Sequence, residues 1–349
     1  MRETKVIDDT QGELIPFRYA ITSYGADYPV DSLVQRLDRD VIFVPEFQRK
    51  YVWTLKQASR FIESLLLGLP VPGVFFAKES DSGKLLIIDG QQRLRTLQYF
   101  YTGLFKGKEF ALTNVQSRYE GRTFKTLEKE DQLRLSDSVI HATIIKQDEP
   151  SNDQSSVYHI FERLNTGGTL LQPQEIRVCI FHGPFADLLE ELNEVQDWRA
   201  IYGPSSKRLK DQELILRFLA LLFFAEKYSR PMAGFLNKFM GENRKLEKTE
   251  KKQITQAFVP TVAVINETLG RKAFRPERAL NAAVCDSVMV GLARRLERKQ
   301  LQKPKQFATA YTHLLGDKEY MSAIKTGTAD EPNIKLRLKK ATEAFAGLD

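Results

Sequence analysis

The sequence is poor in cysteine and histidine, which limits the chemistry that it can carry. It has two cysteines, Cys179 and Cys285, and four histidines among 349 residues. No Cys or His pair stands at the spacing of a structural zinc site, and two distant cysteines do not make a disulfide framework. Because each cysteine lies in an apolar stretch with helical spacing, we expect both to be reduced core residues of a cytoplasmic protein.

Long apolar runs are also missing. The longest lies near residues 218–225, well short of the roughly 20 residues that a membrane-spanning helix needs. The first 25 residues contain no apolar segment typical of a signal peptide. No Gly-x-x-x-x-Gly-Lys-Ser/Thr phosphate loop occurs, so any nucleotide site is not of the P-loop kind. We therefore expect a soluble protein without membrane contact.

Charge is unevenly distributed along the chain. The net charge is +7, and residues 185–349 hold 29 Lys and Arg against 21 Asp and Glu. Two runs, 294–305 and 335–340, are especially basic. Such runs suit a surface that meets nucleic-acid phosphates, although a solvated helix face is the commoner explanation. The candidate DNA-binding residues are Arg294, Arg295, Arg298, Lys299, Lys303 and Lys305.

The most informative stretch is a strand, a turn and a helix. Residues 85–88 are apolar without interruption, as in a strand buried on both faces, and the apolar residues that follow recur at helical spacing as far as Phe100. The first N–H groups of such a helix can bind an anion, and Gly90 lets a ligand approach closely. Asp89 and Gln92 also fit a capping box, which requires no ligand. Both interpretations stay open on spacing alone.

Three short motifs follow one another in the N-terminal half. They are Gln48-Arg-Lys-Tyr-Val-Trp53, Asp89-Gly-Gln-Gln-Arg93 and Phe161-Glu-Arg-Leu-Asn-Thr-Gly-Gly168. As a set they resemble the motifs of the GmrSD restriction endonuclease N-terminal-domain family, whose core is similar to the ParB and sulfiredoxin fold. The resemblance covers roughly residues 25–182, about half of the chain.

The resemblance implies an NTP-binding component of a prokaryotic restriction or phage-defence system that acts on DNA, with hydrolysis of the NTP left open. It implies NTP and Mg²⁺ as cofactors, and DNA and a separate nuclease or defence-system subunit as partners; a homo-oligomer also stays open. The candidate catalytic residues are Asp89, which is also the candidate metal ligand, Gln92 and Arg93. The candidate nucleotide-binding residues are Gln48, Arg49, Lys50, Gly90, Gln91, Arg163, Asn165 and Thr166.

Other functions stay open. Leu94 and Arg95 stand where many members have small hydroxyl-bearing residues, which weakens the hydrolytic interpretation. One alternative is a non-catalytic DNA-binding or adaptor protein with a ParB-like domain, and a less favoured one is a DNA-nicking nuclease built on Asp89. GmrSD-type proteins often carry a His-Asn-His nuclease module, but His313 is the only histidine after residue 182. Cleavage by such a module is therefore not expected.

Two further residues have a functional and a structural explanation. His159 could serve as an acid or base near the third motif, but a structural histidine is more common. Asp286 is an acidic residue in an apolar helical stretch and could be functional. An ion pair with Arg275 or Arg278 accounts for it better.

The predicted fold is α+β, with a ParB-like mixed α/β domain over residues 1–183 and an all-α domain over 184–349. Residues 1–25 are expected to form an irregular arm. Strands are predicted over 41–44, 74–77, 85–88 and 139–145, with helices over 29–39, 54–67, 91–100, 152–164 and 173–181. In the second half, helices are predicted over 185–195, 211–224, 232–240, 254–269, 278–296 and 307–315.

Overall fold

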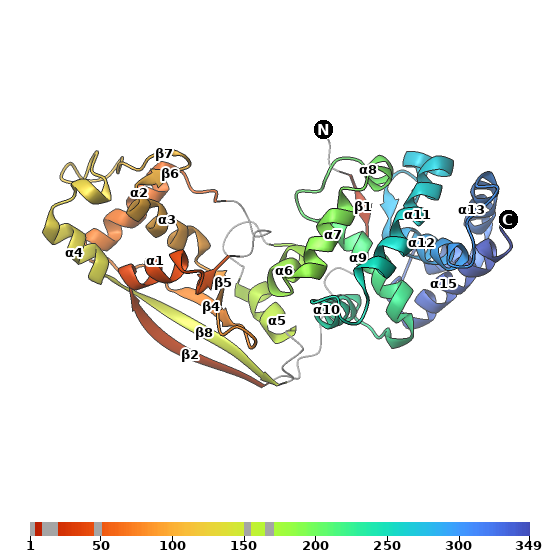
Figure 1. Cartoon of the computed structure of the whole chain (residues 1–349), viewed down its shortest axis with the longest axis horizontal. Helices are drawn as coiled ribbons and strands as arrows, with labels where there is room; N and C mark the ends of the chain where they lie inside the picture. The colour runs from red at the N-terminus through yellow and green to blue at the C-terminus, as the bar shows by residue number, and fades with distance from the viewer. Residues whose placement is uncertain (1–3, 9–19, 45–50, 150–154, 165–170) are drawn as a thin grey trace. The chain divides into compact units, whose positions relative to one another are not determined.

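The computed structural model describes residues 4–8, 20–44, 51–149, 155–164 and 171–349. The chain forms two compact units, Arg18–Leu170 and Met1–Phe17 with Leu171–Asp349. We call them the α/β unit and the helical unit. Their content confirms the α+β fold class, with a sheet in the first unit and helices dominating the second (Figure 1).

A mixed five-stranded sheet forms the base of the α/β unit. Its strand order is β2 (Ala20–Pro29), β8 (Val139–Glu149), β4 (Val74–Lys78), β5 (Leu85–Asp89) and β3 (Ile42–Phe43). β8 pairs antiparallel with β2 and parallel with β4, and β5 pairs antiparallel with β4 and parallel with β3. β2 replaces part of the irregular arm expected over residues 1–25, so that prediction was wrong for residues 20–25.

Helices cover both faces of this sheet. On one face lie α1 (Val30–Asp38), α2 (Leu55–Leu66), α3 (Gln91–Thr102) and α4 (Lys129–Asp137). Leu85 and Ile87 belong to the core beneath these helices, whereas Leu86 and Ile88 are buried outside that core. α5 (Ser155–Leu164) contacts β5 and β8. Successive side chains of β5 are thus buried on opposite faces of the sheet, which confirms the prediction of a strand buried on both faces.

The helical unit packs around two helices that are buried along most of their length. These are α9 (Lys210–Phe224) and α12 (Ala282–Leu296). The surrounding helices are α6 (Pro173–Ile180), α7 (Pro184–Asn193), α8 (Gln196–Tyr202), α10 (Met232–Glu242), α11 (Lys251–Leu269), α13 (Lys305–Gly316), α14 (Lys318–Ala323) and α15 (Glu331–Ala346). α6 packs against α9 and α10, so the sequence expected to close the first domain belongs to this unit by its contacts.

The N-terminal segment also packs in the helical unit. β1 (Val6–Ile7) pairs in parallel with β9 (Leu280–Asn281), directly before α12. Both cysteines lie in this unit, and they are free thiols in the core, as expected. Burial raises the pKa of the Cys179 thiol to about 12, so it stays protonated at neutral pH.

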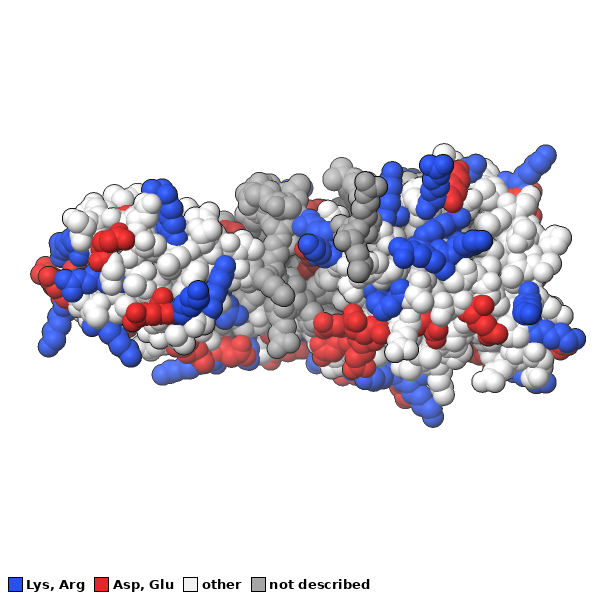
Figure 2. Space-filling view, turned by 90° about the horizontal axis from the view of Figure 1, so that it is seen from above, with Lys and Arg blue, Asp and Glu red and all other residues white. Residues whose placement is uncertain are grey.

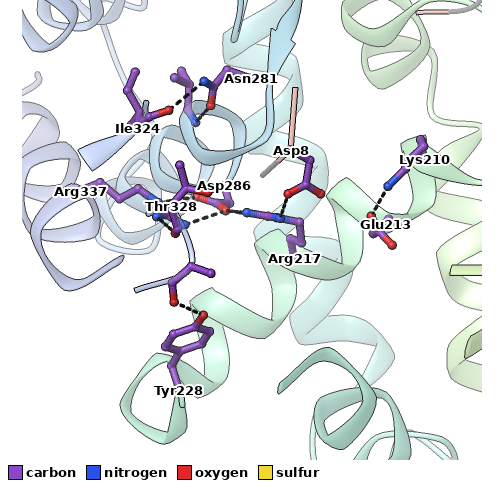
Figure 3. Close-up of polar contacts among 12 residues, drawn as sticks. Asp8, Lys210, Glu213, Arg217, Tyr228, Asn281, Asp286, Ile324, Thr328 and Arg337 are labelled. Atoms are coloured by element: carbon purple, nitrogen blue, oxygen red, sulfur yellow. Dashed lines mark hydrogen bonds and ion pairs between the residues drawn. The ribbon is translucent and has the colours of Figure 1, made fainter. Parts of the chain in front are cut away.

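A buried ionic network joins segments that are far apart in the helical unit (Figure 3). Arg217 donates to Asp286 (Nη2 to Oδ2, 2.8 Å) and to Asp8 (Nη1 to Oδ1, 3.1 Å). Arg337 donates to Asp286 (Nε to Oδ1, 3.1 Å) and to the Thr328 carbonyl. Asp286 therefore has the structural role that we favoured, but its partners among the described residues are Arg217 and Arg337, not the expected Arg275 or Arg278.

Candidate functional site

The turn between β5 and α3 depends on Gly90. This residue is the N-cap of α3 and has φ +100°, a left-handed conformation that favours glycine. A Cβ at this position would also lie 2.4 Å from Cγ1 of Val74. Asp89 is the last residue of β5, so the capping box of Asp89 and Gln92 considered above is wrong. Within the described residues, no side chain caps the N-terminus of α3. Helix N-termini are typical binding sites for anions.

Arg93 lies under this turn with its side chain 84% buried, or 16% exposed. Its Nη2 donates to Asp89 Oδ2 at 2.6 Å and to the Gly73 carbonyl at 2.9 Å. Its Nε is buried and has no hydrogen-bond partner among the residues that the structure describes. Burying a guanidinium N–H without an acceptor is costly, so this atom is a donor that an added oxygen atom would satisfy.

Asp89 is the single acidic residue of the second motif, and it directly precedes Gly90. Its side chain is 48% exposed although one oxygen accepts from Arg93. No group of three or more His, Cys, Asp or Glu able to hold a metal occurs among the residues that the structure describes. Mg²⁺ usually takes one or two carboxylates, with phosphate oxygens and water as its other ligands. A single half-exposed Asp89 fits Mg²⁺ that arrives with a nucleotide.

Gln92 has a structural task in addition to the catalytic one predicted for it. Its Oε1 accepts from the backbone N–H groups of Val52 (2.9 Å) and Trp53 (3.2 Å). These two hydrogen bonds connect the end of the first motif to the start of α3. A direct part of Gln92 in catalysis remains a prediction.

A second contact between the first motif and α3 involves Tyr51 and Thr96. The two hydroxyl oxygens lie 2.7 Å apart. Because the Thr96 hydroxyl donates its hydrogen to the Gln92 carbonyl at 2.7 Å, the Tyr51 hydroxyl must be the donor to Thr96. Burial raises the pKa of Tyr51 to about 12, so this donor keeps its proton.

The structure tests the remaining candidate residues unevenly. Gln91 follows Gly90 as the first residue of α3 and is half-buried. Arg163 lies in the last turn of α5 and is exposed. His159 on the same helix is buried, which supports the structural interpretation of that residue. Five candidates, Gln48, Arg49, Lys50, Asn165 and Thr166, lie outside the described residues.

Sequence reasoning missed the residues that support the motif from other segments. Gly73 supplies the carbonyl that holds Arg93, and a Cβ on Gly73 would meet the His141 carbonyl at 2.7 Å. Val74 packs against Gly90. The Val71-Pro-Gly-Val74 turn before β4 is the sequence signal that could have indicated a close approach.

The basic run at 294–305 is only partly available to a ligand. Arg294 donates to the Thr342 hydroxyl, Arg295 donates to the carbonyls of Leu348 and Lys299, and Lys303 lies 3.7 Å from the Asp349 carboxylate. Arg298, Lys299 and Lys305 are exposed, and DNA contact by the run remains a prediction.

The second basic run, 335–340, does not present all of its cations at the surface. Arg337 is completely buried against Asp286. Lys340 pairs with Asp317 at 2.9 Å and with Glu319 at 2.6 Å. Contacts within the helical unit therefore account for two of the four cations of this run, whereas Lys335 and Lys339 are exposed.

A comparison with protein-family models decides which domain this turn belongs to. The model of the GmrSD restriction endonuclease, N-terminal domain, matches residues 30–182. This stretch is a GmrSD N-terminal domain. The GmrSD domain contains all three motifs and the β5–α3 turn, and it starts directly after β2. The family description relates it to restriction.

A second comparison found no relative. A search of curated proteins gave no significant match. Among the described residues, the helices are either too short or too polar to span a membrane.

Proposed function

We propose that the GmrSD domain binds a nucleoside triphosphate with its phosphates at the β5–α3 turn, as a component of a restriction or phage-defence system that acts on DNA. The observation that carries the proposal is the buried Nε of Arg93, which lacks an acceptor, below a helix N-terminus that no described side chain caps. Helix N-termini and arginine side chains are both typical phosphate ligands.

Four residues have defined tasks in this proposal. Gly90 and Gln91 meet the phosphate oxygens at the N-terminus of α3, and Arg93 offers its Nε. Asp89 holds Mg²⁺ together with phosphate oxygens, and the ion neutralises part of the phosphate charge. The proposal also includes Gln48, Arg49, Lys50, Arg163, Asn165 and Thr166 as further nucleotide contacts.

A thermal-shift screen of ATP, GTP, CTP and UTP with Mg²⁺ tests nucleotide binding. A ligand that binds only the folded chain raises the unfolding temperature by mass action, so at least one nucleotide should raise it in a dose-dependent manner. No shift with any of the four at millimolar concentration would contradict the proposal.

Release of phosphate then separates an enzyme from a binding module. If the domain hydrolyses its nucleotide, Asp89→Asn should abolish release while the protein stays folded, because the variant loses the charge that holds Mg²⁺. If the wild-type protein releases no phosphate with Mg²⁺ or Mn²⁺, with and without DNA, the domain is an NTP-binding adaptor. A separate nuclease or defence-system subunit then performs the cleavage.

A further inference from the structure

A cation-rich turn lies between α11 and β9 in the helical unit. We call residues 270–280 the arginine turn. It begins with the 3₁₀ helix η3 (Gly270–Lys272), and it is closed where Asn281 N–H donates to the Phe274 carbonyl at 2.8 Å. Its four cations are Arg271, Lys272, Arg275 and Arg278, against one acid, Glu277.

Arg275 anchors the turn through carbonyl groups alone. Its Nη1 donates to the carbonyls of Arg271 (2.9 Å), Ala273 (3.0 Å) and Ile201 (3.2 Å), and its Nη2 donates to that of Tyr202 (3.3 Å). These bonds join the turn to the C-terminal end of α8. They satisfy N–H groups but leave the positive charge without a counter-ion.

The charges of the turn confirm this lack of compensation. Burial and the neighbouring positive charge of Arg271 lower the pKa of Arg275, and no carboxylate contributes to the shift. Arg271, Lys272 and Arg278 are exposed. None of the three forms an ion pair with any residue in the described part of the chain. The fold thus holds several cations together, and no carboxylate in the described part of the chain pairs with them.

The N-terminal segment adds another exposed cation to this surface. Lys5 accepts through its carbonyl from Leu280 N–H at 3.1 Å, at the end of the arginine turn. Thr4 Oγ1 donates to the same Tyr202 carbonyl that accepts from Arg275, at 2.9 Å. Lys5 is exposed, and it lies beside the turn because β1 pairs with β9.

We propose that Lys5, Arg271, Lys272 and Arg278 form a phosphate-binding surface for the backbone of duplex DNA. Arginine suits phosphate because its planar guanidinium donates two parallel hydrogen bonds. Figure 2 shows Lys and Arg side chains gathered on one face of the helical unit, with few acidic side chains among them. The choice of duplex DNA among polyanions rests on the proposed function. The run at 294–305 differs, because three of its six cations already contact other groups of this unit.

The test is the salt dependence of DNA binding by the full chain. A Lys272→Glu, Arg278→Glu double variant should bind a fluorescent duplex more weakly, and its log–log slope should be shallower by about 1.8 if two phosphate contacts are lost. All sequences should be affected alike, because phosphate contacts carry no base information. Neither side chain makes a hydrogen bond that the fold needs, so the variant should remain folded.

A matched control carries the same change of charge elsewhere in the helical unit. Lys238→Glu with Lys252→Glu alters two exposed lysines. Lys252 lies near the start of α11, a helix of 19 residues, so it is about 27 Å from the turn along the helix axis. The control should keep the wild-type slope to within about 0.5, because no direct phosphate contact is lost.

Two outcomes would overturn the inference. One is a double variant that keeps the wild-type affinity and slope. The other is the absence of duplex binding by the wild-type chain at low salt. NTP binding is measured separately in the same samples, so its loss or persistence reports on the proposed function and not on the arginine turn.

Discussion

Gln92 and Arg93 are neighbours in the motif, yet their side chains do different work. Gln92 accepts from two backbone N–H groups of the segment that ends the first motif. Arg93 retains a buried N–H without an acceptor. At the scale of single residues, Gln92 connects two segments of the site, and Arg93 keeps an unsatisfied donor, which we propose binds a phosphate oxygen.

Gln92→Ala should therefore act first on stability. The Val52 and Trp53 amides would lose their shared acceptor, and we expect a loss of about 1–2 kcal/mol in the free energy of unfolding, because Val52 is exposed and water can replace one bond. Urea unfolding measures this loss.

Gln98→Ala is the matched control on the same helix. Gln98 bonds only the exposed Asp38 carboxylate and Arg95, so its loss should cost less than ~1 kcal/mol. Equal unfolding midpoints for Gln92→Ala and Gln98→Ala would show that the hydrogen bonds of Gln92 to Val52 and Trp53 do not stabilise the fold.

The β5–α3 turn is the element that sets the site. β5 is buried on both faces, and this burial fixes the position of Asp89 at the end of the strand. Gly90, in a left-handed conformation, then turns the chain into α3. The tight contact with Val74 leaves no room for a side chain at position 90.

Gly90→Ala should destabilise the chain by more than about 2 kcal/mol, because it combines an unfavourable φ with a contact that cannot be accommodated without movement. Gly103→Ala is its control at the other end of α3. Gly103 also has positive φ (+78°), but nothing lies within 4 Å of its Cβ position, so the cost should be about 1 kcal/mol. Thermal unfolding measures the loss of stability in both variants. Similar losses would mean that the Val74 side chain can move away from a Cβ at position 90 at little cost.

Sequence reasoning succeeded where a local pattern determines the element. The apolar run of β5, the helical spacing in α3 and the helix predicted over 54–67, which is α2, were all visible and are confirmed. β2 was missed because it is an edge strand whose side chains are mostly exposed, and its sequence lacks the regular apolar alternation that identifies a half-buried strand.

Contacts between distant segments were beyond prediction. Gln92 meets its partners 40 and 39 residues away, and Asp286 meets Arg217 and Arg337 at separations of 69 and 51 residues. The sequence identifies a polar residue in an apolar stretch, but only the packing of α9, α12 and α15 selects its partner.

At the scale of the whole molecule, the N- and C-terminal segments meet in the helical unit. Asp8 from the start of the chain and Arg337 near its end enter one buried network. Asp286→Asn should cost about 3–5 kcal/mol, because it leaves buried guanidinium groups short of a charge partner.

Glu191→Gln is the control for this prediction. Glu191 pairs with Lys251 at 2.6 Å, a shorter distance than in any ion pair of the network, but both side chains are more than half exposed. Loss of this ion pair should lower the free energy of unfolding by at most ~1 kcal/mol, since solvent screens exposed pairs. Denaturant unfolding compares the two, and equal costs would show that burial does not control the strength of these pairs.

The central claim, that Arg93 binds the phosphates of a nucleotide, is tested most directly by calorimetric titration of Arg93→Ala and Arg95→Ala with the nucleotide that the screen selects. Arg95 lies on the same helix and donates to Gln98. We predict that Arg93→Ala weakens binding by about 1.5–3 kcal/mol, whereas Arg95→Ala binds like the wild type. A folded Arg93→Ala protein with unchanged affinity would contradict the account.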